Sequence, residues 1–221
     1  MARAIVLLSG GLDSCVTTAV AAREHDLFLL HLRYGQRTEA RERRAFESIA
    51  DHYSVPDDRR LIVDTGFLAQ IGASALTDPD IEIPEADLES DTIPITYVPF
   101  RNAHLLSLGV SWAETVAADA VYIGVVQEDS SGYPDCTETF CQAFSKAVQA
   151  GTKEGRVEVR TPVIDLEKAR IVGLGQELNA PLHLTWSCYT NDDLACGVCD
   201  SCVLRLRAFE AAGVSDPVSY A

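Results

Sequence analysis

Residues 5–17 read IVLLSGGLDSCVT, and this stretch decides the fold. Four apolar residues lead directly into Ser9-Gly10-Gly11, which is typical of a buried parallel strand that ends in a tight turn. Two adjacent glycines let the backbone come close to a ligand, and Asp13 or Ser14 is expected to cap a helix that opens there. Because the N–H groups at a helix start attract anions, the stretch predicts a phosphate site.

Two common phosphate-binding motifs do not fit this loop. No Gly-Lys-Ser/Thr follows the glycines as in a Walker loop, and no G-x-G-x-x-G is present as in dinucleotide-binding folds. Residues 9–14, SGGLDS, instead resemble the SGGxDS loop of the ATP pyrophosphatases, a superfamily that adenylates carboxylates, carbonyls and tRNA bases. A strand, turn and helix with incidental glycines is the alternative that a lone SGG would leave open.

The composition is that of an ordinary globular protein. Of the 221 residues, 47% are hydrophobic and 23% are charged. No apolar run approaches the roughly 18 residues that a membrane span requires, and the N-terminus lacks a signal peptide's apolar core, so we expect a cytoplasmic protein. A net charge of −15 argues against nucleic acid as a partner, but a small anionic substrate remains compatible with it.

Apolar runs alternate with amphipathic segments along the chain, which predicts an α/β fold: a Rossmann-like parallel sheet of about five strands between helices. The expected strands are residues 5–8, 27–32, 60–64, 121–126 and 157–163, and the expected helices are residues 14–23, 39–52, 103–118, 138–150, 166–178 and 201–212. Residues 65–94 are rich in acids and interrupted by prolines, so we expect a solvated excursion, either a surface loop or a lid. No linker divides the chain, so residues 1–221 are expected to form one domain.

Four of the seven cysteines lie close together near the C-terminus, as Cys188-x7-Cys196-x2-Cys199-x2-Cys202. Four thiolates at such spacings suit one tetrahedral metal ion, for which Zn²⁺ is the first expectation and an iron–sulfur cluster the alternative. An odd cysteine count in an expected cytoplasmic protein disfavours disulfides. Because a four-thiolate site is coordinatively closed, residues 186–221 are expected to form a small structural zinc-binding segment of the same domain.

Further motifs follow the glycine loop in a fixed order: YGQR at 34–37, VPFRN at 98–102, DSSGYPDC at 129–136, Lys168 and the four cysteines. Together they resemble the 7-cyano-7-deazaguanine synthase family over essentially the whole chain. The resemblance implies an adenine nucleotide α-hydrolase-like fold, a homodimer, one structural Zn²⁺ per chain, and ATP with Mg²⁺ as a substrate.

The activity that the resemblance implies is the ATP-dependent conversion of 7-carboxy-7-deazaguanine and ammonia to the nitrile, by adenylation of the carboxylate and then of the amide. A relative that adenylates another carboxylate, or that stops at the amide, is the alternative. A tRNA-thiolating relative is disfavoured because it needs a basic RNA-binding face. A zinc-stabilised binding module without catalysis is disfavoured by the glycine loop and by the polar residues at several expected strand ends.

The resemblance also implies roles for individual residues. ATP is expected to lie on the loop formed by Leu8, Ser9, Gly10, Gly11, Leu12, Asp13 and Ser14. Catalytic roles fall to three residues: Asp13 fixes the loop or Mg²⁺, while Arg101 and Lys168 counter charge on phosphate or carboxylate. The deazaguanine base is expected to contact Gln36, Asn102, Asp129, Tyr133 and Asp135. A helix-capping role for Asn102 and a plain turn at residues 132–135 are the alternatives.

Two positions depart from the family's pattern. Phe100 stands where glycine is common, and Thr137 stands where arginine is common. A side chain at Phe100 is expected to crowd a close approach of the backbone, and Thr137 removes a positive charge from the region expected to hold an anion. Both departures bear on which acid is the substrate, whereas the adenylating loop is intact.

Overall fold

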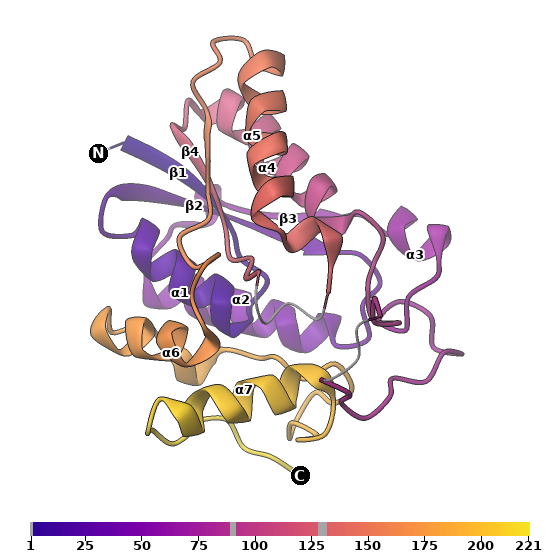
Figure 1. Cartoon of the computed structure of the whole chain (residues 1–221). Helices are drawn as coiled ribbons and strands as arrows, with labels where there is room; N and C mark the ends of the chain where they lie inside the picture. Colours follow the sequence, from indigo (N-terminus) through magenta and orange to yellow (C-terminus); the bar gives the residue numbers. More distant parts are fainter. Residues whose placement is uncertain (1, 89–91, 128–131) are drawn as a thin grey trace.

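The structure is a computed structural model that describes residues 2–88, 92–127 and 132–221. Five strands form one sheet in the order β3-β2-β1-β4-β5, and every neighbouring pair is parallel (Figure 1). The strands are β1 Ala2–Leu7, β2 His25–Arg33, β3 Arg60–Asp64, β4 Ala120–Ile123 and β5 Glu158–Arg160. The predicted α/β fold class is therefore confirmed.

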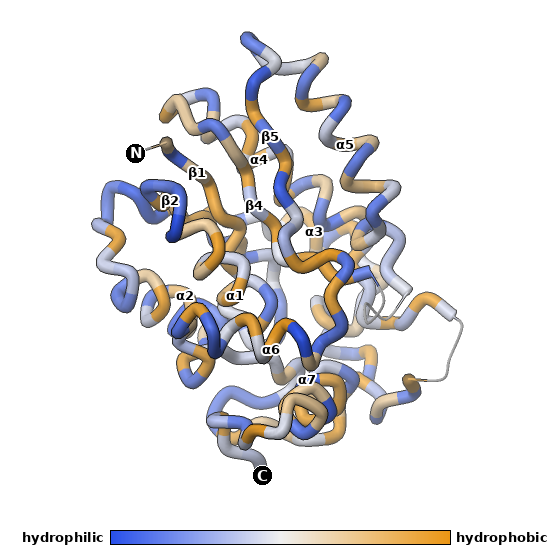
Figure 2. The backbone as a smooth tube through the Cα atoms, turned by 60° about the vertical axis from the view of Figure 1, so that its left-hand side comes forward, coloured by the Kyte–Doolittle hydropathy of each residue, from blue (hydrophilic) through white to orange (hydrophobic). Residues whose placement is uncertain are grey.

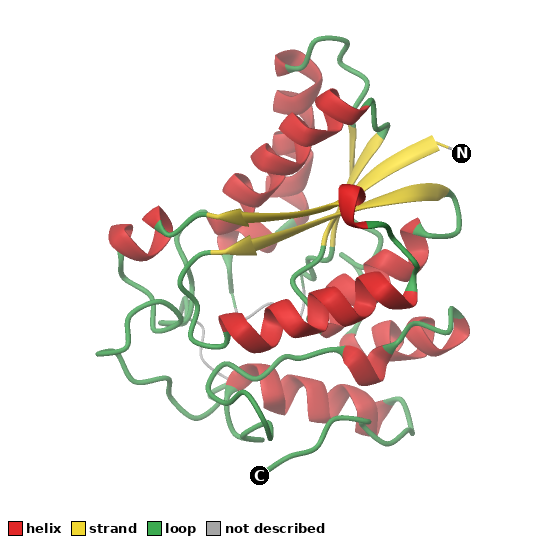
Figure 3. Cartoon of the chain, turned by 180° about the vertical axis from the view of Figure 1, so that it is seen from behind, coloured by secondary structure: helices red, strands yellow, loops and turns green. Residues whose placement is uncertain are grey.

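Helices cover both faces of the sheet. They are α1 Leu12–Ala21, α2 Glu39–His52, α3 Phe67–Ile71, α4 Arg101–Val116, α5 Glu138–Gly151, α6 Lys168–Glu177 and α7 Asp200–Ala211. Three single-turn 3₁₀ helices join them, at Asp57–Arg59, Pro134–Cys136 and Leu182–Leu184. The helices α6 and α7 pack on each other and form a further layer beyond α1 (Figures 1 and 3).

The first strand shows why the sheet is buried on both faces. Side chains alternate along a strand, so Ala4 and Val6 face α1 and α2, whereas Ile5 and Leu7 face α4. All four residues are apolar and buried. In Figure 2, β1 turns from a hydrophilic colour near the N-terminus to a hydrophobic colour along the rest of the strand. An uninterrupted apolar run is what a central parallel strand requires.

The predicted capping of the first helix is wrong. The helix begins at Leu12 with Gly11 in the N-cap position, and no side chain caps it. Gly10 turns the chain with a φ of +96°, so the helix opens one residue before Asp13 and includes Ser14. The Ser14 hydroxyl then donates to the Gly11 carbonyl at 3.0 Å instead of accepting from a backbone N–H group.

Of the solvated excursion predicted at residues 65–94, the described residues, 65–88 and 92–94, are only partly solvated. They contain α3, and Leu68, Ala75 and Leu76 are buried. The Arg37 guanidinium ties the segment down by donating to the carbonyls of Ala75, Asp78 and Ile81. Within the described ranges, no helix has the length and apolar character needed to cross a membrane.

Candidate active site

A cavity opens at the carboxyl ends of β1, β2 and β4. The chain leaves β1 toward β2 on one side and later returns to β4 on the other, so this is the point where the strand order reverses. Parallel sheets of this kind bind ligands at such points. The glycine loop, the start of α4, the start of α6 and residues 186–189 contribute further walls.

The glycine loop has a shape that larger residues cannot adopt. A Cβ atom at Gly10 would lie 2.8 Å from the Glu42 carbonyl oxygen and 2.9 Å from the Ala45 Cβ atom. A Cβ atom at Gly124, just after β4, would lie 2.8 Å from the Asp13 carbonyl carbon. Both glycines therefore allow the loop and the start of α1 to fit tightly between α2 and β4.

Asp13 and Lys168 join two helix starts at the cavity wall. Asp13 lies in the first turn of α1 and Lys168 is the first residue of α6. The Lys168 Nζ atom donates to Asp13 Oδ2 at 2.6 Å. The second oxygen, Asp13 Oδ1, is buried and accepts no hydrogen bond from the described part of the chain. It is therefore an acceptor that a cation or a ligand donor can use.

Arg101 presents a positive charge to the same cavity. It is the first residue of α4, so the positive end of the helix dipole adds to its charge. Its Nη1 atom donates to the Tyr34 hydroxyl at 2.9 Å, and burial raises the pKa of Tyr34 to about 12, so this phenol is neutral. Of the carboxylates in the described ranges, none lies within ion-pair distance of Arg101. The guanidinium is thus able to bind an anionic group in the cavity.

Three of the predicted base-binding residues, Gln36, Asn102 and Tyr133, line the cavity. Tyr133 is held by a 2.8 Å hydrogen bond between its hydroxyl and Thr96 Oγ1, and its ring lies 5.4 Å from that of Tyr97. Asp129 lies outside the described residues.

The structure places Asp135 behind the cavity wall, at the start of α4. Its carboxylate accepts from the Asn102 backbone N–H group at 2.9 Å, and only 3% of the residue is exposed. The Asn102 side chain in turn donates to the Asp135 carbonyl at 3.0 Å and to Cys136 Sγ at 3.2 Å. The alternative that Asn102 caps the helix is therefore wrong, because Asp135 supplies the acceptor at this end of α4.

The two departures from the family's pattern lie outside the cavity. Phe100 adopts a left-handed conformation with φ +58° and is 56% exposed, and its ring lies 5.9 Å from that of Phe140. The predicted crowding is therefore not seen, while the backbone conformation is one that favours glycine. Thr137 caps α5 by accepting from the Phe140 N–H group at 3.2 Å.

Sequence reasoning missed Glu42, a carboxylate on the cavity wall. Its Oε1 atom accepts from Thr38 Oγ1 at 2.9 Å, and its Oε2 atom accepts from Gln36 Nε2 at 3.0 Å. A signal was present, because Glu42 lies on the helix face that carries the buried residues Ala45 and Phe46, three and four positions later. An acid on a buried helix face needs partners or a function.

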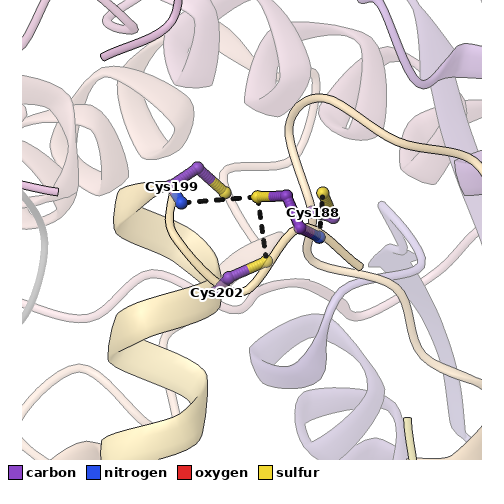
Figure 4. A group of neighbouring side chains, drawn as sticks. Cys188, Cys199 and Cys202 are labelled. Carbon is purple, nitrogen blue, oxygen red and sulfur yellow. Dashed lines mark hydrogen bonds between the residues drawn. The ribbon is translucent and has the colours of Figure 1, made fainter. Parts of the chain in front are cut away.

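The four predicted metal ligands come together. The Sγ atoms of Cys188, Cys196, Cys199 and Cys202 all lie within 4.8 Å of one another. Figure 4 shows the side chains of Cys188, Cys199 and Cys202 gathered at the start of α7. Three backbone N–H groups donate to Cys188 Sγ at 3.3 to 3.4 Å, from Thr190, Asn191 and Cys196. Such donors stabilise thiolate charge, so the cluster is suited to hold a metal ion.

The cysteine cluster also supports the cavity. Trp186 and Ala45 pack in the same buried group as Cys188. The Trp186 backbone N–H group donates to the Gly10 carbonyl at 2.9 Å, and Trp186 itself lines the cavity. The segment that carries the first cysteine therefore contacts the glycine loop directly.

Comparison with known proteins identifies the family. The family model described as "Queuosine biosynthesis protein QueC" matches residues 3–213. The chain belongs to this family. Among relatives of the QueC family, the 7-cyano-7-deazaguanine synthase of Koribacter versatilis is 56% identical over 223 residues, covering 99% of this chain and 93% of the relative. The 7-cyano-7-deazaguanine synthase of Chlorobium phaeobacteroides is 53% identical over 220 residues, covering 99% of this chain and 96% of the relative.

A solved structure was also found, the NH3-dependent NAD synthetase of Campylobacter jejuni in complex with the nitrate ion. It is 14% identical, with a TM-score of 0.47, and the alignment covers 82% of this chain and 66% of that chain.

Proposed function

We propose that this chain converts 7-carboxy-7-deazaguanine, ammonia and two molecules of ATP into 7-cyano-7-deazaguanine, two molecules of AMP and two of pyrophosphate. The names of its relatives support this activity, since those that are 56% and 53% identical are 7-cyano-7-deazaguanine synthases. One structural observation carries the proposal. One cavity, at the point where the strand order reverses, is lined by the glycine loop at the start of α1 and by the Arg101 guanidinium. In the described chain this guanidinium has no carboxylate partner.

We place the phosphates of ATP on residues 8–14, at the start of α1. Lys168 balances their negative charge, and Asp13 holds Lys168 through the 2.6 Å ion pair. The buried Oδ1 atom of Asp13 is the acceptor that this site offers to the Mg²⁺ that accompanies ATP. A divalent cation on the phosphates stabilises the charge that develops during transfer at the α-phosphorus.

The oxygen of a carboxylate or of an amide is a poor leaving group, and adenylation lets it leave as part of AMP. A carboxylate oxygen of the acid attacks the α-phosphorus of ATP, and pyrophosphate leaves with the electron pair of the broken P–O bond. Ammonia attacks the acyl carbon, AMP leaves with the oxygen, and loss of one proton gives the amide. The amide oxygen then attacks the α-phosphorus of a second ATP, and pyrophosphate again leaves with the electron pair of the broken P–O bond. Departure of AMP with the amide oxygen and the loss of two protons then give the nitrile.

The residues of the cavity position the acid for these steps. Arg101 binds its carboxylate, because a guanidinium offers two parallel N–H groups to such an anion. Gln36, Asn102 and Tyr133 contact the base, together with Asp129. Asp135 acts through α4: by accepting from the Asn102 N–H group it fixes the helix start that carries Arg101.

We propose that the four cysteines hold one structural Zn²⁺. A tetrahedral site with Zn–S bonds of about 2.3 Å separates its sulfurs by roughly 3.8 Å. The Cys196 and Cys202 Sγ atoms lie 3.9 Å apart, and all four lie within 4.8 Å. These separations favour a single ion over a cluster of several irons. The metal would secure residues 186–221 as the C-terminal part of one ATP-pyrophosphatase-type domain that spans residues 1–221.

We propose further that the protein works as a cytoplasmic homodimer. Two exposed aromatic side chains lie near the start of α4: Phe67 is 45% exposed and Phe100 is 56% exposed. His104 links the rings of Phe67 and Phe100, at 5.4 and 6.4 Å. Such a patch favours contact with a second copy of the chain. Light scattering of the wild type and of Phe67→Asp tests this, and a wild-type monomer would contradict it.

Product analysis tests the function. The metal-loaded protein is incubated with 7-carboxy-7-deazaguanine, Mg-ATP and ammonium, and the products are identified by mass spectrometry. A nitrile with AMP and pyrophosphate is the expected result. Accumulation of the amide would assign a relative that stops halfway, and absence of acid-dependent ATP consumption would overturn the proposed function.

A further inference from the structure

A basic and an acidic side chain, each without an ion-pair partner in the described part of the chain, line the cavity. In the described part of the chain, Arg101 has no carboxylate within ion-pair distance and Glu42 has no cation within that distance. Both residues belong to the cavity wall, on different elements: Arg101 begins α4 and Glu42 lies in the first turns of α2. A ligand that carries an anion at one end and hydrogen-bond donors at the other would satisfy both.

The hydrogen bonds that Glu42 already accepts define how many further donors its carboxylate can bind. Each carboxylate oxygen offers about two lone-pair directions. One direction on Oε1 is used by Thr38 Oγ1 and one on Oε2 by Gln36 Nε2. One acceptor position per oxygen is left, so the group suits two parallel N–H donors at the spacing of a carboxylate.

That arrangement distinguishes the two purine-like rings of the proposed reaction. A guanine-type edge presents N1–H and the 2-amino group side by side, which are two parallel donors. An adenine edge presents the 6-amino donor beside the N1 acceptor, and this acceptor repels a carboxylate oxygen. A carboxylate with two open acceptor positions therefore matches the guanine-type edge.

We propose that Glu42 binds the N1–H and 2-amino edge of the deazaguanine substrate, and so determines its specificity from the end opposite to the carboxylate held by Arg101. This inference rests on the proposed function, because it takes the substrate from it. Glu42 offers the base an acceptor that Asp135 does not offer. The Asp135 carboxylate lies behind the cavity wall, where it accepts from the Asn102 backbone N–H group. Of the described carboxylates on the wall, the other one, Asp13, is paired with Lys168.

The test compares two substrates in two proteins. The substrates are 7-carboxy-7-deazaguanine and its analogue without the 2-amino group, and the proteins are the wild type and Glu42→Gln. We expect the wild type to prefer the amino substrate by about 10- to 100-fold in kcat/KM, the value of a charge-assisted hydrogen bond. In Glu42→Gln the preference should fall to within about threefold of unity, while the KM for ATP changes less than about twofold. The ratio is taken within one protein, so it does not depend on the fraction that folds.

Glu47→Gln is the matched control, because Glu47 lies on the same helix and pairs with Arg43 at the surface. It should keep the wild-type preference. An unchanged preference in Glu42→Gln would overturn the inference while the proposed function stands, and so would a raised KM for ATP with the preference retained. A wild type that turns over neither substrate would overturn the proposed function, and the inference with it.

Discussion

Lys168 and Asp13 form an ion pair to which we assign a role in both the fold and the proposed reaction. Their side chains are 18% and 24% exposed, so the pair is partly shielded from water. We expect Lys168→Met to lower acid-dependent pyrophosphate release by about 100-fold or more, as removal of a group that balances developing charge does in other enzymes. Measured under the same conditions, Lys168→Arg should keep more of the rate because it keeps the charge.

The melting temperatures of both Lys168 variants separate the two roles. Lys168→Met leaves the Asp13 carboxylate without its cation, so we expect a loss of about 1–3 kcal/mol in the free energy of unfolding. Wild-type pyrophosphate release by Lys168→Met would contradict the assignment of Lys168 to the phosphates.

Phe100 adopts a backbone conformation that glycine adopts without strain. With φ at +58°, a residue with a Cβ atom costs about 1–2 kcal/mol, and glycine returns part of that through its greater freedom in the unfolded chain. Both Phe100→Ala and Phe100→Gly lose the ring contacts with His104 and Phe140, but only the glycine variant relieves the strain. We expect Phe100→Gly to be more stable than Phe100→Ala by about 0.5–1 kcal/mol in denaturant unfolding. Equal stability would contradict strain at this position.

At the scale of elements, a buried ion pair joins α7 to the chain that follows it. Arg205 and Asp216 are 3% and 5% exposed, and the guanidinium donates to both carboxylate oxygens at 2.8 and 2.9 Å. Arg205 also donates to Thr185 Oγ1 at 2.7 Å, which connects α7 to the segment just before Cys188. Because removal of one partner leaves a buried charge, we expect Asp216→Asn to lose about 3–5 kcal/mol of stability, against little change for the exposed Asp193→Asn.

The same pair predicts a pH dependence. Burial alone would raise the pKa of Asp216, but hydrogen bonds from Arg205 and Tyr220 hold it below its usual value of 3.8. A carboxyl whose pKa is lower in the folded state stabilises the fold above the unfolded pKa. Its contribution is therefore complete above about pH 4 and is lost as the pH falls through the folded-state pKa. We expect the free energy of unfolding of Asp216→Asn to depend less on pH in this acidic range than that of the wild type. The same pH dependence in both proteins would contradict the pairing of Asp216 with Arg205.

At the scale of the whole molecule, the local patterns of the sequence predicted the α/β layering. The apolar runs of β1 and β2 and the amphipathic pattern of α2 require only near neighbours to interpret, and α2 was predicted at residues 39–52 as observed. The glycine loop, Arg101 and Lys168 all line one cavity. A parallel sheet favours this arrangement, because the carboxyl ends of its strands meet at one edge.

What could not be predicted depends on contacts between distant residues. Arg37 holds residues 75–81 through backbone carbonyls, which carry no sequence signal, so the segment was predicted to be more solvated than it is. Asp135 lies 33 positions from Asn102 in the sequence and accepts from its backbone N–H group at the start of α4, where the local pattern offered Asn102 itself as an alternative cap. Glu42 was overlooked because a single acid on an amphipathic helix is ordinary until its neighbours in space are known.

The cysteine cluster links stability to the cavity across the molecule. Cys199 occupies the N-cap position of α7, and Cys188 follows Trp186 by two residues. The Trp186 backbone N–H group in turn donates to the Gly10 carbonyl of the glycine loop. We therefore expect chelation of the metal, or Cys199→Ser, to lower the melting temperature by about 10 °C or more and to weaken ATP binding together with activity. Metal content, thermal unfolding and ATP affinity are measured on the same samples.

Cys141→Ser provides the matched control for this experiment. Cys141 is 5% exposed and packs against the other face of the sheet, so its replacement alters one buried contact and leaves the four-sulfur cluster intact. It should keep full metal content and ATP affinity, with a smaller fall in melting temperature. If Cys199→Ser lost metal and activity while its melting temperature and ATP affinity stayed at wild-type values, the metal would act in the reaction. A structural ion must instead move all of these quantities together, because the sulfurs contact the cavity only through packed structure: residues 186–189, and the part of α7 whose Ser201 and Leu204 line the cavity.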